Sequence, residues 1–303
     1  MRQEQQSVSF GLEQDLRRKR LNPWLDFVVR IFKEKPLSAV GLVIVCLLLL
    51  MAATAQWIAP HDYREQVLDE ALLGHSLDHP LGTDQIGRDQ LSRIIVGAQV
   101  SMIVGFSCVI GFLIVSIVIG MGSGYVGGAI DIIVQRIVDG WMTIPTLILL
   151  LAMVAVVGQG MWQIIFILSI DRGISTSRVL RGEALYLKEN TYVEAARALG
   201  AGNLRIFLVH IIPNAFASII VMATISLGVF ILAEASLSFL GYGIPPPFPT
   251  WGSMLSGSAL GFMARAPWIA IWPGVALTLA VWAFNMLGDG MRDLLDPRLR
   301  GSG

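Results

Sequence analysis

The sequence predicts an all-α integral membrane protein, and three observations support this class. Hydrophobic residues make up 54% of the chain and charged residues only 15%, whereas a soluble domain usually carries about 25% charged residues. The mean hydropathy is +0.67. Five long stretches contain no charged residue, and each is long enough for a helix to cross a bilayer, which takes about 20 residues.

These uncharged stretches locate the expected spans, because a charge at the bilayer centre costs roughly 2.5–3.5 kcal/mol. They cover residues 36–60, 94–130, 140–170, 210–233 and 266–288. The first, fourth and fifth are each predicted to be one span. The second is longer than one span, so we expect an interfacial helix followed by a span over about 100–124.

The third stretch is predicted to hold two spans. As one helix it would be roughly 46 Å long, too long for one untilted crossing. Gly158-Gln159-Gly160 lies near its middle and is typical of a helix break. We therefore expect one span that ends near Val157 and another that begins at Met161, which gives six transmembrane helices in total.

The distribution of lysine and arginine predicts that both termini are cytoplasmic. With the N-terminus inside, 18 of the 22 basic residues fall in cytoplasmic segments, and only Arg64, Arg88, Arg93 and Arg265 lie outside. Residues 17–20 are all basic and no cleavable apolar segment precedes residue 36, so this cluster is interpreted as a cytoplasmic anchor. Nucleic-acid binding is the less favoured interpretation, because the net charge is zero.

The largest outer loop, residues 61–93, contains three of the four histidines: His61, His75 and His79. His75 and His79 are four residues apart, a spacing that on a helix could bind a metal. Pro80 follows directly and the flanking residues are typical of a loop. We therefore expect a solvated loop here and no metal site.

Enzymatic functions are disfavoured by what the sequence lacks. The two cysteines, Cys46 and Cys108, provide neither a disulfide framework nor a zinc site. No G-x-x-x-x-G-K-[ST] motif is present, so the chain is not expected to bind ATP by a phosphate loop. His210 has no evident serine or cysteine partner, so no catalytic residue is expected. The chain is also expected to bind no cofactor of its own.

A glycine pattern near the end of the second span is interpreted as a packing motif. Residues 122–127 match G-x-G-x-x-G, but the dinucleotide-binding interpretation needs a preceding strand, and here a transmembrane helix precedes the motif. Gly120, Gly124 and Gly128 recur every four residues. Small residues at this spacing allow membrane helices to pack closely.

A proton- or ion-driven carrier would need ionisable groups inside the spans. Only Glu234, near the outer end of the fifth span, and the pair Asp171-Arg172, low in the fourth, meet this condition. A carrier or channel that is not coupled to ATP is therefore the less favoured alternative. For Glu234 two interpretations stay open: a gate or path residue, or a hydrogen-bonded residue at the membrane boundary.

A cytoplasmic segment after the fourth span predicts a short, capped helix. Thr191 and Glu194 have the spacing of a capping box, so the helix should begin at Tyr192. Gly200 is placed to end it in the left-handed region. The face formed by Tyr192, Ala196 and Leu199 must pack against something, because so short a helix is unstable alone. The spacing leaves open whether that is a partner protein or the membrane surface.

Glu194-Ala195-Ala196 followed by Gly200 resembles the EAA loop of ABC importer permeases. More closely, the chain resembles the C-type permeases of the dipeptide/oligopeptide/nickel importer family. The matching segments are LGTD at 81–84, GRD at 87–89, SR at 92–93, LSFLG at 237–241, PP at 246–247, FN at 284–285 and the GDG, RD and LDP groups within 288–297. Residues 169–173 depart from the family, which commonly places an aromatic residue and proline or tyrosine there.

The resemblance implies a type I ABC importer permease with a MetI-like core and one extra N-terminal helix. It implies a cytoplasmic tail (1–35), a first span with an extracytoplasmic loop (36–96), a permease core (97–291, with the EAA loop at about 188–214) and a cytoplasmic tail (292–303). It places the protein in the inner membrane of a bacterial or archaeal cell.

The resemblance also implies partners and a coupling site. The partners are a homologous second permease, two ATPase subunits that bind ATP and Mg²⁺, an extracytoplasmic substrate-binding protein and the lipid bilayer. The coupling helix would enter a cleft of one ATPase subunit, and its residues would be Thr191, Tyr192, Val193, Glu194, Ala195, Ala196, Leu199 and Gly200. Peptides are the expected substrate, with nickel, glutathione or oligosaccharides as alternatives.

Overall fold

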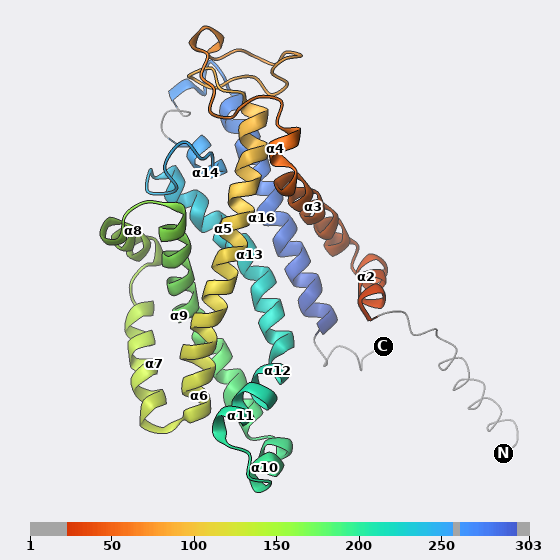
Figure 1. Ribbon diagram of the computed structural model, residues 1–303, viewed down its shortest axis with the longest axis vertical. Helices are drawn as coiled ribbons and strands as arrows, with labels where there is room; N and C mark the ends of the chain where they lie inside the picture. The colour runs from red at the N-terminus through yellow and green to blue at the C-terminus, as the bar shows by residue number, and fades with distance from the viewer. Residues whose placement is uncertain (1–22, 257–260, 296–303) are drawn as a thin grey trace, which may run out of the picture.

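The computed structural model describes residues 23–256 and 261–295, with side chains over 29–256 and 261–294, and is built from helices (Figure 1). Within these ranges no β-strand occurs, and an isolated bridge joins Thr83 to Asp89. The predicted helical class is confirmed. The basic cluster at 17–20 and the last residues of the C-terminal tail lie outside the described residues.

Five long helices form the body of the protein. They are α3 (Pro36–Ala53), α5 (Gln90–Ser116), α9 (Met161–Lys188), α13 (Phe216–Phe239) and α16 (Trp268–Leu295). Figure 1 shows them along the long axis of the molecule. α5 is central, because it contacts each of the other four.

Shorter helices join or flank the long ones. They are α2 (Pro23–Glu34), α4 (Ala55–Ile58), α6 (Gly122–Val126), α7 (Gly128–Met142), α8 (Thr146–Val157), α10 (Thr191–Ala198), α11 (Asn203–Ile206), α12 (Ile212–Asn214) and α14 (Trp251–Met254). A 3-10 turn covers Leu68–Glu70. π-helical turns at Ile117–Met121 and Phe207–Ile211 join α5 to α6 and α11 to α12.

The two ends of the molecule differ. Residues 59–89, between α4 and α5, form an irregular loop at one end, which we call the loop end (Figure 1). At the opposite end α10, α11 and α12 lie together, and we call this the α10 end (Figure 1).

The span count predicted from the sequence is only partly reproduced. Four helical segments are long and apolar enough to cross a membrane: Pro36–Ala53, Gln90–Val126, Phe216–Phe239 and Trp268–Leu294. The pair α7 and α8 meets the same condition as one broken span. α9 has 28 residues, but Asp171, Arg172 and Arg178 lie near its middle. Six spans therefore remain a prediction.

Of two local predictions about the spans, one is wrong and the other is confirmed with an added bend. The expected interfacial helix before residue 100 is absent, because α5 runs unbroken from Gln90. The predicted break is confirmed, because α8 ends at Val157 and α9 begins at Met161. The segment before the break is not one straight helix, since α7 and α8 are bent by 95° between Met142 and Thr146. Pro145 precedes α8 and lacks the N–H that a continuous helix needs. With 12 residues, α8 alone is about 18 Å long, too short to cross.

The apolar core lies among the long helices and leaves much of their surface uncovered. Phe112, Ile164, Phe230 and Phe284 are fully buried where α5, α9, α13 and α16 meet. Only 33–39% of the residues in the four span segments are buried within the chain. The remaining apolar surface must face lipid or another subunit, since water would not stabilise so large an apolar area.

Small residues bring the continuation of α5, which is the π-helical turn at Ile117–Met121 and α6, into backbone contact with α9. A Cβ atom on Gly120 would clash with the carbonyl oxygen of Ser177, and one on Gly124 would lie 3.0 Å from the carbonyl oxygen of Arg181. The predicted packing role is therefore supported at these two glycines. It is wrong for Gly128, which has a φ of +61° and no heavy atom near its Cβ position; this residue forms the turn into α7.

Gly120→Ala should destabilise the protein, because the added methyl group meets backbone, which cannot rotate away. Overpacking of this kind typically costs about 1–3 kcal/mol. Gly182→Ala is the matched control, since Gly182 lies in α9 with open space at its Cβ position. Thermal unfolding in detergent measures both variants. Equal midpoints for Gly120→Ala and wild type would contradict the close α5–α9 contact.

Candidate functional site

The N-terminus of α10 differs from the sequence prediction. The helix begins at Thr191 rather than Tyr192, with Asn190 at the N-cap position and no side-chain capping bond. The predicted capping box between Thr191 and Glu194 is therefore wrong. The side-chain amide of Asn190 instead donates to the carbonyl oxygen of Leu187 at 3.2 Å, so it satisfies the end of α9 and keeps the turn between the two helices tight.

The C-terminus of α10 forms as predicted. Gly200 has a φ of +84°, a conformation that glycine adopts without strain. Its N–H donates to the carbonyl oxygen of Arg197 at 2.9 Å, and the Ala201 N–H donates to that of Ala196 at 3.0 Å. This pair of bonds is the Schellman motif. It ends the helix at a fixed residue and sets the direction of the chain toward α11.

α10 is stabilised by its inward face. Val193 is 0% exposed and lies in an apolar cluster with residues of α9, α11 and the following turns. The cluster consists of Met121, Leu180, Ala184, Leu187, Val193, Ile206, Ile211, Ala215 and Ile219. Ala196, predicted to contact a partner, is partly buried against this cluster. An eight-residue helix that would be unstable alone is thereby held rigidly.

The outward face of α10 carries apolar side chains that the chain itself does not cover. Leu199 is 88% exposed and Tyr192 is 37% exposed. Ala195 is also exposed. Leu204, on α11, exposes most of its side chain as well. A rigid helix end with exposed apolar residues is suited to insertion into a groove of another protein.

Ion pairs attach the lower part of α9 to α7. Arg181 forms two hydrogen bonds with the Asp131 carboxylate, at 2.7 and 2.6 Å. Arg178, one turn earlier in α9, pairs with Asp139 about two turns later in α7. Bidentate arginine–carboxylate pairs fix orientation as well as distance. α7, α9 and, through the apolar cluster, α10 are therefore held in one arrangement.

Within the segment that departs from the family pattern, Asp171 has a structural partner. Its carboxylate is buried and accepts a hydrogen bond from Trp141 Nε1 of α7 at 3.1 Å. This contact joins α7 to α9 near the bend between α7 and α8. It accounts for a charged residue at this position without an ion pathway.

Glu234 lies inside the bundle near the loop end. Its side chain is 1% exposed, and Oε1 accepts a hydrogen bond of 2.5 Å from the Ser238 hydroxyl one turn later. Ser238 also lines a cavity of about 250 Å³ together with Arg88, Arg93 and Ser253. Glu234 does not line this cavity itself but contacts it through Ser238. Its hydrogen bond supports the interpretation of Glu234 as a hydrogen-bonded residue at the membrane boundary.

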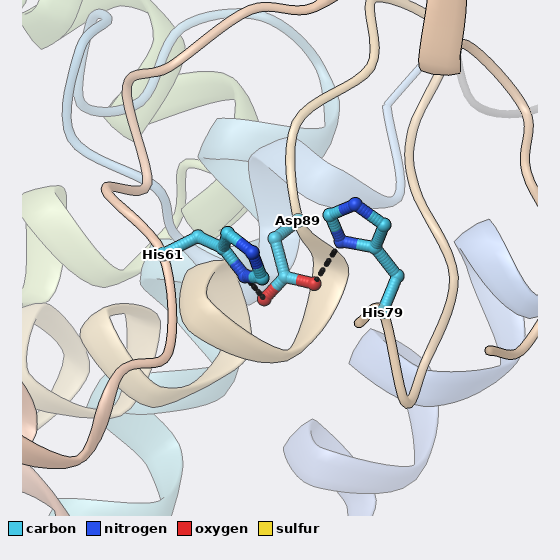
Figure 2. Close-up of side chains that lie close together, drawn as sticks. All are labelled: His61, His79 and Asp89. Carbon is cyan, nitrogen blue, oxygen red and sulfur yellow. Dashed lines mark hydrogen bonds and ion pairs between the residues drawn. The ribbon is translucent and has the colours of Figure 1, made fainter. Parts of the chain in front are cut away.

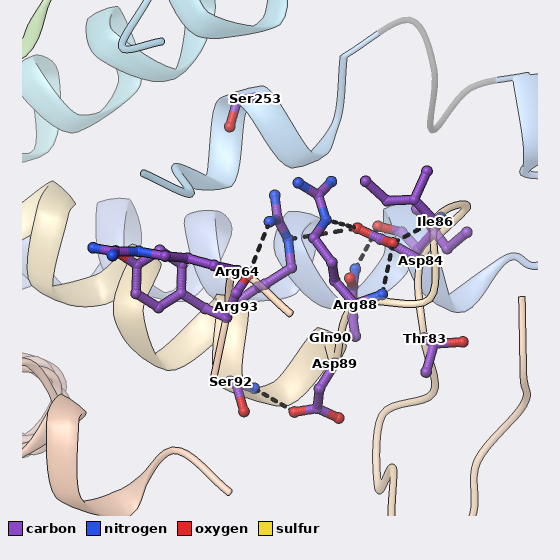
Figure 3. Close-up of polar contacts among 12 residues, drawn as sticks. Arg64, Thr83, Asp84, Ile86, Arg88, Asp89, Gln90, Ser92, Arg93 and Ser253 are labelled. Carbon is purple, nitrogen blue, oxygen red and sulfur yellow. Dashed lines mark hydrogen bonds and ion pairs between the residues drawn. The ribbon is translucent and has the colours of Figure 1, made fainter. Parts of the chain in front are cut away.

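Residues 81–89, which contain the LGTD and GRD motifs, place two buried carboxylates, Asp84 and Asp89, at the loop end. Asp84 accepts hydrogen bonds from the Arg88 guanidinium at 2.6 Å and from the Arg88 and Ile86 backbone N–H groups at 3.0 Å. Arg93 Nε lies 3.7 Å from the same carboxylate (Figure 3). Gly87 lies in this turn with a φ of +78°, and a Cβ atom there would clash with the Val67 carbonyl. The segment is visible in the sequence as a motif, but its structural role depends on how the loop folds.

Asp89, the second carboxylate, begins α5. It accepts a hydrogen bond of 2.7 Å from the Ser92 backbone N–H, which is a helix N-cap. It also faces two histidine rings (Figure 2). His79 Nδ1 lies 2.9 Å from Asp89 Oδ1, and His61 Nδ1 lies 3.9 Å from Oδ2.

The histidines of the loop are arranged differently from the prediction. His79 is 6% exposed, so the expectation of a solvated loop is wrong at this residue. His75 lies apart, with its ring near Trp268. The neighbour of His79 is His61, whose ring centroid is 4.7 Å away. No sequence signal pairs these two residues, because their approach depends on the fold of the loop between them.

The carboxylates around His79 affect its protonation. Burial lowers the pKa of the ring, but the hydrogen bonds and charges of Asp89 and Glu70 raise it by more, so the net pKa lies above the usual value of 6.5. An imidazolium is stabilised by neighbouring negative charge. His79 therefore carries more positive charge near neutral pH than a free histidine does.

Comparison with known proteins identifies the family. Residues 116–301 match the binding-protein-dependent transport system inner membrane component, and residues 22–75 match the N-terminal TM domain of oligopeptide transport permease C. The chain is 39% identical to a dipeptide transport system permease protein of Alkalihalophilus pseudofirmus over 280 residues, which cover 92% of this chain and 91% of that protein.

Two other relatives are similar over nearly their whole length. A glutathione transport system permease protein of Escherichia coli is 40% identical over 280 residues, 92% of both chains. An oligopeptide transport system permease protein of Bacillus subtilis is 36% identical over 294 residues, 97% of this chain and 96% of that protein. The chain therefore belongs to the family of binding-protein-dependent transport system inner membrane components.

Proposed function

We propose that this chain is a transmembrane permease subunit of an ATP-driven importer of dipeptides or oligopeptides. The observation that carries the proposal is the similarity, over more than nine-tenths of the chain, to permease proteins of dipeptide and oligopeptide transport systems. The chain itself performs no catalysis under this proposal. ATP and Mg²⁺ bind to partner ATPase subunits, since this sequence has no phosphate loop.

The proposed assembly contains a homologous second permease, two cytoplasmic ATPase subunits and an extracytoplasmic substrate-binding protein. The large uncovered apolar surface of the spans supports a second permease beside this one. The exposed Tyr192 and Leu199 on the rigid α10 support docking into an ATPase subunit. The loop end, with its folded Asp84 and Asp89 turns, is the surface offered to the binding protein.

The mechanism follows from how α10 is held. ATP closes the ATPase subunits, and each carries its docked helix with it. Because the Val193 cluster and the Arg181–Asp131 pair fix α10, α9 and α7 together, displacement of α10 moves these helices as one body. The path then alternates between inward-facing and outward-facing states. Such an equilibrium shifts only by the differential affinity of a ligand for the two states, so ATP and the loaded binding protein supply the bias.

Peptide is the favoured substrate, and the relatives name one close alternative. A relative at 40% identity is a glutathione transport system permease protein, and glutathione is itself a small peptide. Nickel and oligosaccharides are the further alternatives, and a carrier or channel not coupled to ATP is the alternative of a different class. Binding measurements on the cognate binding protein, with each substrate class in turn, separate the four substrate classes.

The proposed orientation places the α10 end and both termini in the cytoplasm and the loop end outside. The asymmetry of lysine and arginine supports it, with 18 of 22 in the proposed cytoplasmic segments. Epitope tags at Arg2 and Gly303 should be protected from protease added to intact cells or spheroplasts, and a tag at His75 should be cleaved. A C-terminal tag that is accessible from outside would rule out the six-span topology.

Gly200→Val tests the coupling role of α10. A β-branched side chain at a φ of +84° is strained, so the end of α10 and the position of Leu199 should change. The spans do not depend on this turn, so membrane levels should stay normal. We expect reduced retention of the ATPase subunits during purification and loss of substrate-stimulated ATP hydrolysis and peptide uptake.

Gly202→Val is the matched control for this experiment. Gly202 lies two residues away with a φ of −70° and open space at its Cβ position, so it should retain activity. Full transport by Gly200→Val at normal expression would show that α10 is not the transmission element. If no subunit with a phosphate loop co-purifies with the wild-type protein, the proposal of an ATP-driven importer is wrong.

Glu234→Gln separates the two interpretations of Glu234. Glutamine removes the charge but keeps an oxygen that accepts the Ser238 hydrogen bond. If Glu234 acts by this bond, transport and ATP hydrolysis should be close to wild type. Glu234→Leu should lower thermal stability, because it leaves the Ser238 hydroxyl without its acceptor, at a cost of about 1–3 kcal/mol. Loss of transport by Glu234→Gln at normal stability would instead assign a gate role to the charge.

A further inference from the structure

We propose that His61, His79 and Asp89 form a binding site for a divalent transition-metal ion such as Zn²⁺ at the loop end. One ring nitrogen of each histidine and one carboxylate oxygen of Asp89 lie within 4.8 Å of one another (Figure 2). Imidazole nitrogen and carboxylate oxygen are ligands that Zn²⁺ and similar ions accept. This inference is independent of the transport proposal, because it rests on the loop alone.

The geometry needs only small movements to hold an ion. Zn²⁺ binds nitrogen and oxygen at about 2.0–2.2 Å, so tetrahedral ligands lie roughly 3.3 Å apart. His79 Nδ1 and His61 Nδ1 lie 2.9 and 3.9 Å from the two Asp89 oxygens. The two distances bracket that separation. Since all three ligand atoms lie within 4.8 Å of one another, the side chains would have to close by at most about 1.5 Å to surround a common centre.

The His61 ring nitrogen provides an independent indication of a ligand. Nδ1 of His61 is buried and has no hydrogen-bond partner within the described residues. Its distance of 3.9 Å from Asp89 is too long for a hydrogen bond. A buried polar atom without a partner is costly, and an ion between the two rings would satisfy it. The backbone N–H of His61 donates to Ser92 Oγ at 3.0 Å, so the residue itself is held in place.

Glu70 is positioned to hydrogen-bond the ring nitrogen of His79 that would not bind the metal. Its Oε2 lies 3.2 Å from His79 Nε2, the nitrogen on the far side of the ring. A ligating histidine almost always donates its second N–H to a carboxylate, carbonyl or water, which fixes the tautomer and directs the other nitrogen at the metal. Glu70 therefore orients His79 with Nδ1 toward Asp89.

The charge around the site favours a cation. A cavity of about 260 Å³ opens beside the two rings, and its lining includes Asp62, Glu65, Glu70, Asp78 and Asp89 but no lysine or arginine. It has room for a water molecule as the fourth ligand. Arg88 and Arg93 are directed to Asp84 instead.

The proposed ion would join three separate parts of the loop end. His61 follows α4, His79 lies in the middle of the loop, and Asp89 caps α5. An ion that binds all three closes the loop onto the first turn of α5, and its binding free energy adds to the stability of that arrangement. The role inferred is structural, with the open ligand position filled by water.

The test uses the full chain, purified with an affinity tag that contains no histidine and stripped with EDTA. Titration with Co²⁺ followed by visible absorption should reveal the bands of a tetrahedral site with nitrogen ligands, and metal analysis after Zn²⁺ loading should give about one ion per chain. Zn²⁺ should also raise the midpoint of thermal unfolding, because it binds the folded loop.

Variants assign the ligands. His61→Gln and His79→Gln should each abolish the Co²⁺ bands, and Glu70→Gln should weaken binding roughly 10- to 100-fold, as loss of an outer partner does. His75→Gln is the matched control, because His75 belongs to the same loop but lies near Trp268; it should bind like wild type. Asp89 is not substituted, since it also caps α5.

Two results would overturn the proposal. One is the absence of a tetrahedral Co²⁺ spectrum in wild-type protein. The other is equal Zn²⁺ binding by wild type, His61→Gln and His79→Gln, which would mean nonspecific attraction to the acidic loop. Unfolding midpoints without metal show whether the variants are folded. If a variant fails to fold, the Co²⁺ spectrum and the Zn²⁺ stoichiometry of the wild-type protein decide whether the site exists.

Discussion

The carboxylate of Asp89 is the contact on which the loop end of this protein depends. It caps the first turn of α5 through the Ser92 N–H and faces the rings of His61 and His79. α5 in turn contacts α3, α9, α13 and α16. A helix that begins at a fixed residue has a fixed register. This one carboxylate therefore joins the fold of the loop to the first turn of the central helix.

The second constraint is the close approach of two helix backbones in the half of the bundle nearer the α10 end. Gly120 and Gly124 allow α9 to lie against the continuation of α5. Without a hydrophobic driving force in lipid, such contacts and polar bonds are what hold membrane helices together. The Arg181–Asp131 pair adds a polar bond where α9 meets α7. Together these contacts make the lower part of the bundle one body, and α10 is attached to that body through Val193.

The sequence predicted features that local chemistry determines. Charge-free stretches located α3, α13 and α16, and the position of Gly200 predicted the end of α10, because only glycine adopts its φ of +84° without strain. The capping box failed because Asn190 turns its amide back onto α9, so Thr191 became the first helical residue. Hydropathy carries no information about the 95° bend between α7 and α8, although Pro145 was a signal for it. The meeting of His61 with His79 depends on tertiary folding, which no local pattern encodes.

The two ends of the molecule place different demands on the same long helices. At the α10 end the proposed coupling role requires a rigid element, and the helix that exposes Tyr192 and Leu199 is anchored by apolar packing, which tolerates no gap. At the loop end the contacts are polar and charged, with Asp84 and Asp89 each accepting several bonds. Both carboxylates are buried, so these bonds hold the turns of the loop in a fixed arrangement. Under the proposed function, the binding protein would meet an end that charged hydrogen bonds hold in place, and the ATPase subunit would meet an end that apolar packing holds in place.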